Sequence, residues 1–172
     1  PPKEPLVSPH LWTDALADYL VGLIQDHLGE SLSLSRVAKV RPDELAPIAF
    51  SDPLEDALPA VYVILGDPRI LPARIIGPVV DVEERFRLIF LKRGPIDQAD
   101  TAALNADIQA LTALLRDHPW VEPEVLPAPT QQLLPLVMDG VEYDPPELRP
   151  LRKLDAALTG CALPVRIVTT TA

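Results

Sequence analysis

The segment Val82–Arg93, VEERFRLIFLKR, constrains the fold most, because its side chains alternate with a period of two. That period predicts a β-strand, in which successive side chains point to opposite faces of the sheet. The two faces divide the residues into two sets: Val82, Glu84, Phe86, Leu88 and Phe90 on one, and Glu83, Arg85, Arg87, Ile89 and Leu91 on the other. We therefore expect the Glu-Arg half to be exposed to solvent on one side, and the Leu-Ile-Phe-Leu half to be buried on both sides.

Two segments space their apolar side chains three and four residues apart, which predicts amphipathic helices. The first runs from His10 to Leu28, with Ser8 as its N-cap, Pro9 in its first position and Gly29 as its stop. The second runs from about Asp97 or Asp100 to His118, and Pro119 ends it.

Short apolar runs bounded by Pro, Gly and Asp predict further strands. Leu133–Met138 contains Pro135 and should lie at a sheet edge, and Asp139-Gly140 should turn the chain into Val141–Tyr143. Residues 41–59, 67–78 and most of 121–150 are rich in proline and should be loops. A weak helix should span Leu148–Leu158 and end at Gly160. The other predicted strands are Arg36–Val40, Ala60–Leu65 and Pro164–Thr170, the last with Pro164 in its first position.

This order predicts an α+β fold with a mostly antiparallel sheet and two main helices packed on one face. Residues 1–8 should form an extended arm, and residues 9–172 a single domain. The 21 prolines and 7 glycines are compatible with two explanations, thermostable loops or a GC-rich genome.

Composition excludes some classes of function. The chain has 25 acidic and 15 basic residues, and the resulting net charge of −10 argues against a general nucleic-acid binder. The single cysteine, Cys161, excludes an internal disulfide and a cysteine-based zinc site, and indicates a reducing compartment. We expect no signal peptide, and no apolar run is long enough to cross a membrane.

No residue pattern indicates catalysis, a metal or a cofactor. His10, His27 and His118 lack metal-ligand spacing, and the last two should cap helix ends. We expect three carboxylate pairs to be solvated: Asp43-Glu44, Glu55-Asp56 and Glu83-Glu84. The two side chains of Glu83-Glu84, in the long strand, should point to opposite faces. Glycine-rich phosphate loops and nucleophile elbows are absent from the sequence.

Basic residues on the long strand form the candidate interaction site. Arg85, Arg87, Lys92 and Arg93 are cationic in an acidic chain, and Arg69 and Arg74 lie in the preceding segment. They could dock a protein partner, although pairing with cross-strand Glu or Asp is the favoured interpretation. Trp12 and Trp120 are both interpreted as core residues, with a subunit contact as the alternative for Trp120.

The chain resembles the tail terminator family of long-tailed phages and related tail-like machines. The resemblance rests on four stretches in this order, together covering about residues 9–171: HLWTDALADYLVGLIQDHL followed by LPAVYVIL, then DVEERFRLIFLKR, then DTAALNADIQALTALLRDH, and finally ALPVRIVTTT after DGVEYDP. LLRDHPW is also similar to a stretch in some cap proteins of contractile injection systems. The proline-rich segments 41–59 and 121–150 and the arm 1–8 exceed what a minimal member needs.

The resemblance implies a structural virion protein without enzymatic activity or cofactor. It implies a homo-oligomer, a hexameric ring that caps the tail tube and joins it to the head-side connector protein. DNA would pass through the ring without specific binding, and the protein would assemble in the host cytoplasm and reside in the tail or neck of the virion. An acidic lumen would repel DNA phosphates.

Two alternatives remain from the sequence. The first is another neck or minor tail protein, such as a connector or stopper, or the cap of an injection system. The second is a small cytosolic enzyme or ligand-binding domain, which would need a pocket with converging polar groups.

Overall fold

The computed structural model describes residues 9–27, 32, 34–45, 58–76, 79–93, 98–125, 133–149 and 158–171. Predictions for the arm 1–8, for Glu55-Asp56 and for the chain from 151 to 157 lie outside these residues. The elements in chain order are α1 (Pro9–Asp26), β1 (Arg36–Val40), β2 (Ala60–Leu65), β3 (Arg69–Ile76), β4 (Val79–Arg93), α4 (Gln98–Asp117), β5 (Trp120–Val121), the 3₁₀ turn η1 (Pro123–Val125), β6 (Leu134–Met138), the 3₁₀ turn η2 (Pro146–Leu148) and β7 (Leu158–Thr171).

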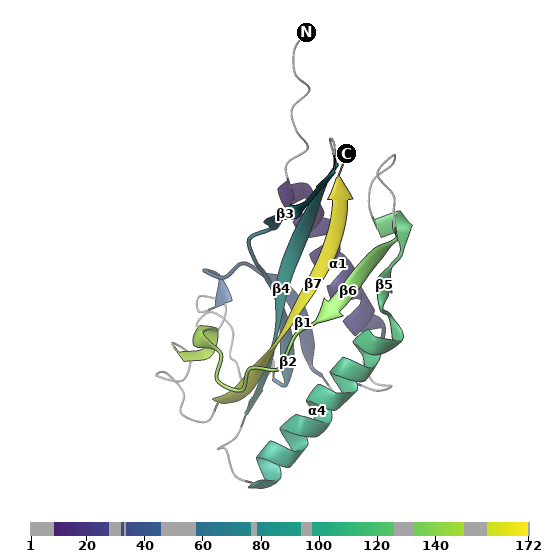
Figure 1. Cartoon of the computed structure of the whole chain (residues 1–172). Helices are drawn as coiled ribbons and strands as arrows, with labels where there is room; N and C mark the ends of the chain where they lie inside the picture. Colours follow the sequence, from purple (N-terminus) through teal and green to yellow (C-terminus); the bar gives the residue numbers. More distant parts are fainter. Residues whose placement is uncertain are drawn as a thin grey trace.

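Among the described residues, seven strands form a curled sheet in the order β1-β2-β4-β7-β6-β5, with β3 also paired to β4 (Figure 1). Only the β1–β2 pair is parallel, and the remaining pairs are antiparallel. The predicted α+β class with a mostly antiparallel sheet is confirmed.

The long strand β4 is the spine of this sheet. It pairs with β7 from Val80 to Arg93, while β2 and β3 share its other edge. The predicted alternation is confirmed in its apolar half, because Phe86, Leu88 and Phe90 belong to one core cluster and Ile89 and Leu91 to another. Each of these five side chains is at most 2% exposed.

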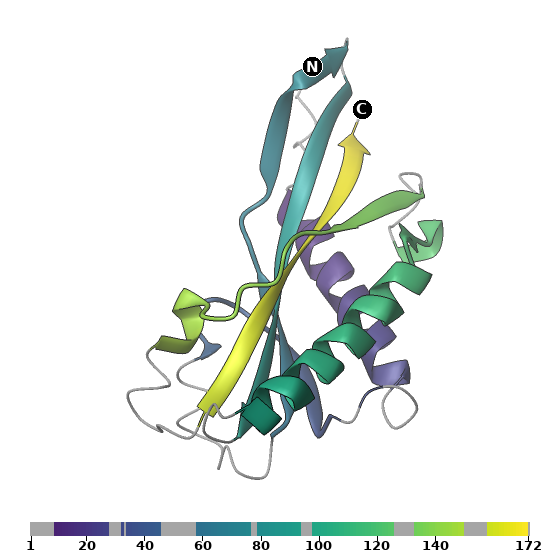
Figure 2. The same cartoon turned by 60° about the horizontal axis from the view of Figure 1, so that its bottom comes forward.

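The larger core lies between the sheet and both helices, which pack on the same face (Figure 2). Leu16 and Leu20 of α1 and Leu111 and Leu115 of α4 enter this core and are at most 2% exposed. Burial of each leucine contributes roughly 1.5–3 kcal/mol, so the apolar stripes hold the helices in place. Trp12 is buried here, as predicted.

The second cluster covers only one end of the opposite face. Tyr62, Ile64, Ile89 and Leu91 pack there against Leu148 of η2. The other end of this face, over the Glu-Arg half of β4, has no helix among the described residues and is called the open face below.

The segment predicted as a loop, 67–78, instead contains strand β3. Gly66 brings β2 and β3 onto one edge of β4, because its N–H donates to Arg85 O at 2.9 Å and an added Cβ would lie 2.7 Å from that oxygen. Pro72 is tolerated because it lies where the β3–β4 register shifts, between Leu71 and Ile76. The prolines of this segment therefore predicted a loop where an irregular edge strand forms.

The last strand begins earlier than predicted. Leu158 and Gly160 belong to β7, so the helix predicted to end at Gly160 is wrong there, and Pro164 lies inside the strand. Ala162 exchanges both backbone hydrogen bonds with Glu142, so the backbone of Pro164, two residues on, faces that same side. The backbone nitrogen of Pro164, which has no hydrogen to donate, therefore faces residues 139–141, between β6 and Glu142, rather than β4.

The turn predicted at Asp139-Gly140 does not form a hairpin. Met138 pairs with Val165 and Glu142 pairs with Ala162, so the chain continues along the same edge of β7. Strand β6 is confirmed, but β5 pairs with its first residues, and Pro135 therefore does not keep β6 at the sheet edge.

Glu83 and Glu84 were interpreted as solvated, and this is wrong. They point to opposite faces as predicted, yet they are only 6% and 0% exposed. Glu84 lies on the helix side, where the Thr13 hydroxyl of α1 donates to its Oε2 at 2.7 Å. The strand pattern predicted the faces, but the position of α1 decides the burial of Glu84.

Replacing Thr13 with Val should lower the free energy of unfolding by about 1.5–3 kcal/mol, because a buried carboxylate loses a hydrogen-bond donor. Urea unfolding measures the change. Thr112→Val is the matched control, since that hydroxyl contacts Gln109 O at the surface, and it should change stability by less than about 0.5 kcal/mol. Equal effects of the two substitutions would contradict a role for the Thr13–Glu84 contact.

A second prediction concerns the close contact at Gly160. A Cβ there would lie 2.5 Å from Phe90 O and 2.6 Å from Leu148 Cδ1, whereas one at Gly140 would meet nothing within 4 Å. Gly160→Ala should therefore destabilise the fold by about 1–3 kcal/mol through overpacking. Thermal unfolding should show a lower Tm for Gly160→Ala and little change for Gly140→Ala, and the reverse order would show that the β4–β7 contact is looser.

Candidate interaction surface

The structure separates the seven residues singled out from the sequence. Arg85 and Arg87 lie on the open face of β4, whereas Lys92 points to the helix side and pairs with Asp107 of α4 at 3.6 Å. The predicted single basic patch on one strand is therefore wrong. Arg69 of β3 is exposed and stands opposite Glu83 in the register. Arg74 and Arg93 lie in β3 and β4, but their side chains fall outside the description.

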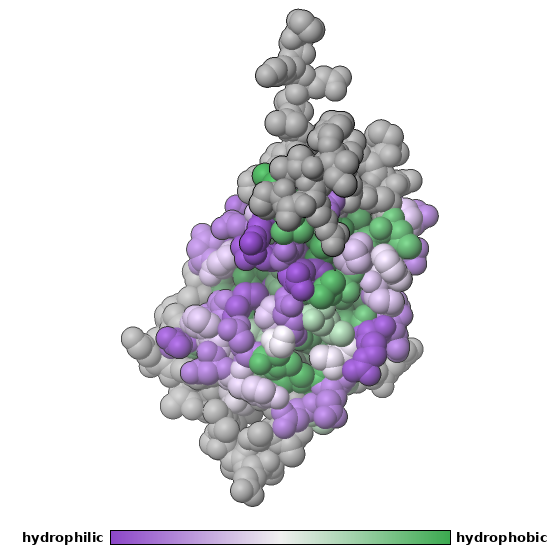
Figure 3. All heavy atoms as spheres, in the orientation of Figure 1, coloured by the Kyte–Doolittle hydropathy of each residue, from purple (hydrophilic) through white to green (hydrophobic). Residues whose placement is uncertain are grey.

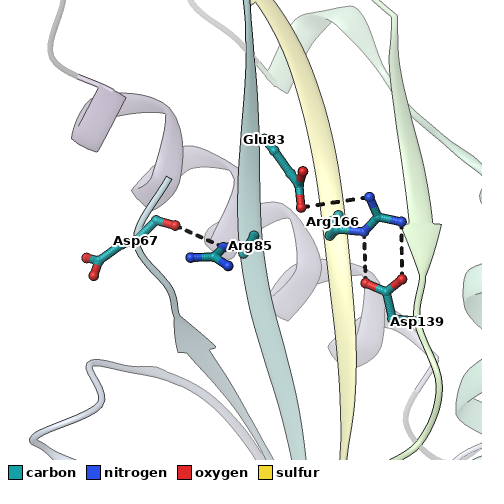
Figure 4. Close-up of polar contacts among 5 residues, drawn as sticks. All are labelled: Asp67, Glu83, Arg85, Asp139 and Arg166. Atoms are coloured by element: carbon teal, nitrogen blue, oxygen red, sulfur yellow. Dashed lines mark hydrogen bonds and ion pairs between the residues drawn. The ribbon is translucent and has the colours of Figure 1, made fainter. Parts of the chain in front are cut away.

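Arg166 of β7 joins the site and was missed by the sequence reasoning. It stands directly opposite Arg85 in the β4–β7 register, so the two side chains share the open face. Like charges in this arrangement destabilise a sheet. Figure 4 shows how the pair is accommodated, with the two guanidinium groups turned away from each other. Arg166 could be recognised only from the pairing register of β4 and β7, two strands that lie far apart in the sequence.

Two carboxylates hold Arg166, Asp139 at the end of β6 and Glu83 on β4. Its Nε and Nη2 donate to Asp139 at 2.8 and 3.1 Å, and its Nη1 lies 3.8 Å from Glu83 Oε1 (Figure 4). The hydrogen bond to Asp139 raises the pKa of Arg166 further, so the group stays cationic. This bidentate pair fixes the guanidinium plane beside β6.

Arg87 is neutralised by two carboxylates. Its Nη2 lies 2.6 Å from Glu142, and its Nε lies 2.7 Å from Glu147 of η2. Pairing with acids, the favoured interpretation of the basic residues, therefore describes Arg87 and Lys92.

Arg85 differs from its neighbours. It is exposed, and its Nε donates to the backbone oxygen of Asp67 at 3.2 Å. Within the described ranges, no carboxylate lies within 4.0 Å of its guanidinium. A hollow of about 410 Å³ lies between Arg85 and Arg166, with Gly66, Glu83 and Asp139 in its lining. Arg85 thus presents charged donors to an open, partly apolar hollow.

Exposed apolar side chains continue the open face beyond Arg166. Val137 stands opposite Arg166, and Trp120 stands opposite Pro135 on the next strand. Trp120 is 50% exposed, so its interpretation as a core residue is wrong. Leu133 is 51% and Val137 is 37% exposed. Figure 3 shows apolar residues gathered over the β5–β6 part of this face. We call Arg85, Arg166, Trp120, Leu133 and Val137 the Arg–Trp surface.

His27 and His118 are structural, and the side chain of His10 lies outside the description. The Nδ1–H of His27 donates to Leu23 O, and that of His118 donates to Leu114 O, each at 2.9 Å. The predicted capping role at both helix ends is confirmed. The two rings also meet edge to face, with centroids 5.6 Å apart, and join the ends of α1 and α4.

A second hollow, of about 540 Å³, lies beside α1. Its lining includes Thr13, Asp14, Arg41, Asp43 and Asp67. Asp43 and Glu44 are exposed, as predicted, and Glu44 accepts a hydrogen bond from the backbone N–H of Arg41 at 3.0 Å. No group of three or more metal-ligating side chains occurs in the part of the chain that the structure describes.

Cys161 is a poor nucleophile in this fold. Its side chain is 1% exposed in the larger core, and burial raises the pKa of its thiol to about 12. At pH 8 only about one molecule in ten thousand would carry a thiolate, and the thiolate is the reactive form. Iodoacetamide should therefore leave Cys161 unmodified in the folded protein at pH 8 and modify it in urea, as measured by mass spectrometry. Rapid labelling of the folded protein would contradict the burial of Cys161.

No family model matches the chain, and no curated protein matches it in sequence. Among the described helices, none combines the length and apolar character needed to cross a bilayer.

Proposed function

We propose that this chain is a structural subunit of a phage tail or a related tail-like machine, a tail terminator that forms a ring at the end of the tail tube. The observation that carries the proposal is the Arg–Trp surface. A half-exposed tryptophan lies on the same face as a cross-strand arginine pair, two strands from Arg166, and Trp and Arg are both enriched in interface cores. The order of the elements, taken with the resemblance of the sequence, supports an assembly role for this surface.

The proposed mechanism needs rigid contacts rather than chemistry. A ring of identical subunits closes through heterologous contacts, in which one surface of each copy meets a different surface of the next. The bound ring would end polymerisation of the tube and offer its other side to the head-side connector. A strand as long as β4, paired over 14 residues with β7, is a stiff scaffold for such contacts.

A connector or stopper of the neck would use the same kind of surface, and it is the nearest alternative. A ligand-binding domain is the second candidate, favoured by the hollow of about 540 Å³ beside α1. That volume lies within the range of small-molecule sites.

Electron microscopy of particles assembled without this protein tests the proposal. A terminator should leave overlong tails of variable length, because nothing stops addition of tube subunits. Full heads without tails would instead identify a connector, and particles of normal form would contradict both neck functions. Restoration of normal tail length by the wild-type protein is the control.

A further inference from the structure

We propose that the Arg–Trp surface binds a second copy of this chain, with a carboxylate of that copy seated against Arg85 in the hollow of about 410 Å³. The inference rests on the proposed function and deepens it, because it names the surface through which neighbouring subunits meet. The occupant is a second copy carrying an acidic side chain flanked by apolar ones.

Charge at the hollow is the first argument. Arg166 and Arg87 already have carboxylates within 3 Å, whereas Arg85 has one hydrogen bond, to a backbone oxygen. An arginine fork binds a carboxylate through two parallel hydrogen bonds, and the terminal amino groups of Arg85 contact no acid within the described ranges.

The charge of the whole chain is the second argument. With 25 acidic and 15 basic residues, an identical copy offers more carboxylates than cations. In the lining of the hollow, Glu83 and Asp139 both contact Arg166, which leaves Arg85 without a carboxylate partner among the described residues. A head-to-tail contact between different faces of two copies would supply one.

The apolar side of the surface is the third argument. Trp120, Leu133 and Val137 are 50%, 51% and 37% exposed, and Val137 is the cross-strand neighbour of Arg166. Apolar anchors beside a charged fork are the usual arrangement of binding hot spots. These side chains do not line the hollow itself, so in the proposed contact they would pack against apolar residues that flank the acidic side chain of the second copy.

Sedimentation velocity of the full chain tests the proposal, with Arg85→Glu and Arg85→Gln compared with wild type. Wild type should self-associate, and association should weaken as NaCl rises from 0.05 to 0.5 M, as expected for screened charges at about these ionic strengths. Arg85→Glu should raise the dissociation constant at least about tenfold, and Arg85→Gln by a smaller factor. Arg116→Glu, the same charge change on the exposed side of α4, is the matched control and should leave it within about twofold.

Tryptophan fluorescence locates the contact independently. Trp12 is 5% exposed and Trp120 is 50% exposed, so acrylamide quenching reports on Trp120. Quenching should fall as wild type associates and should not change with concentration in Arg85→Glu. Trp120→Ala should weaken association without changing the far-UV circular dichroism spectrum.

Two results would overturn the inference: wild type that stays monomeric at every concentration reached, or Arg85→Glu and Trp120→Ala variants that assemble with wild-type affinity. In the second case a ring could still form through another surface, and the proposed function would stand. If particles assembled without the protein are normal, the proposed function is contradicted, and self-association of the chain can still be measured.

Discussion

The pairing of β4 with β7 is the interaction on which the rest of the structure depends. The ladder joins Val80–Arg93 to Leu158–Thr171 without a break and crosses the centre of the sheet. Every residue of these strands is assigned to one of two faces by this register. Because side chains alternate along both strands, one ladder creates the helix-bearing core, the smaller cluster under η2, and the open face.

The ladder also explains where polar groups are buried. Glu84 falls on the helix side and is enclosed under α1, where Thr13 contacts it. Glu83 falls on the open face and lies near Arg166. Burying a carboxylate is costly unless it is hydrogen-bonded or paired, so these contacts fix how α1 and β7 sit on β4. The charged half of β4 therefore helps to hold the fold together and also forms part of the open face.

The open face combines features that a purely structural sheet would avoid. Two arginines stand opposite each other, one of them with no carboxylate of the described chain within 4.0 Å of its guanidinium, and a tryptophan lies half exposed two strands from the other. In an isolated domain these features lower stability and solubility. Their presence is accounted for if the face is covered in an assembly, which is why the proposed ring and the proposed contact depend on the same few residues.

The sequence by itself determined the local elements. Alternation along VEERFRLIFLKR predicted the spine and its faces, helical spacing predicted α1 and α4, and the run AVYVIL predicted β2, because local periodicity reflects which side of an element is buried. Tertiary structure alone decided what meets across strands. The partnership of Arg85 with Arg166, the burial of Glu84 and the exposure of Trp120 depend on registers between segments up to about 80 residues apart, which no local pattern encodes. Proline misled the sequence reasoning at Pro72 and Pro164 for the same reason, since a missing backbone donor matters only where a neighbouring strand needs it.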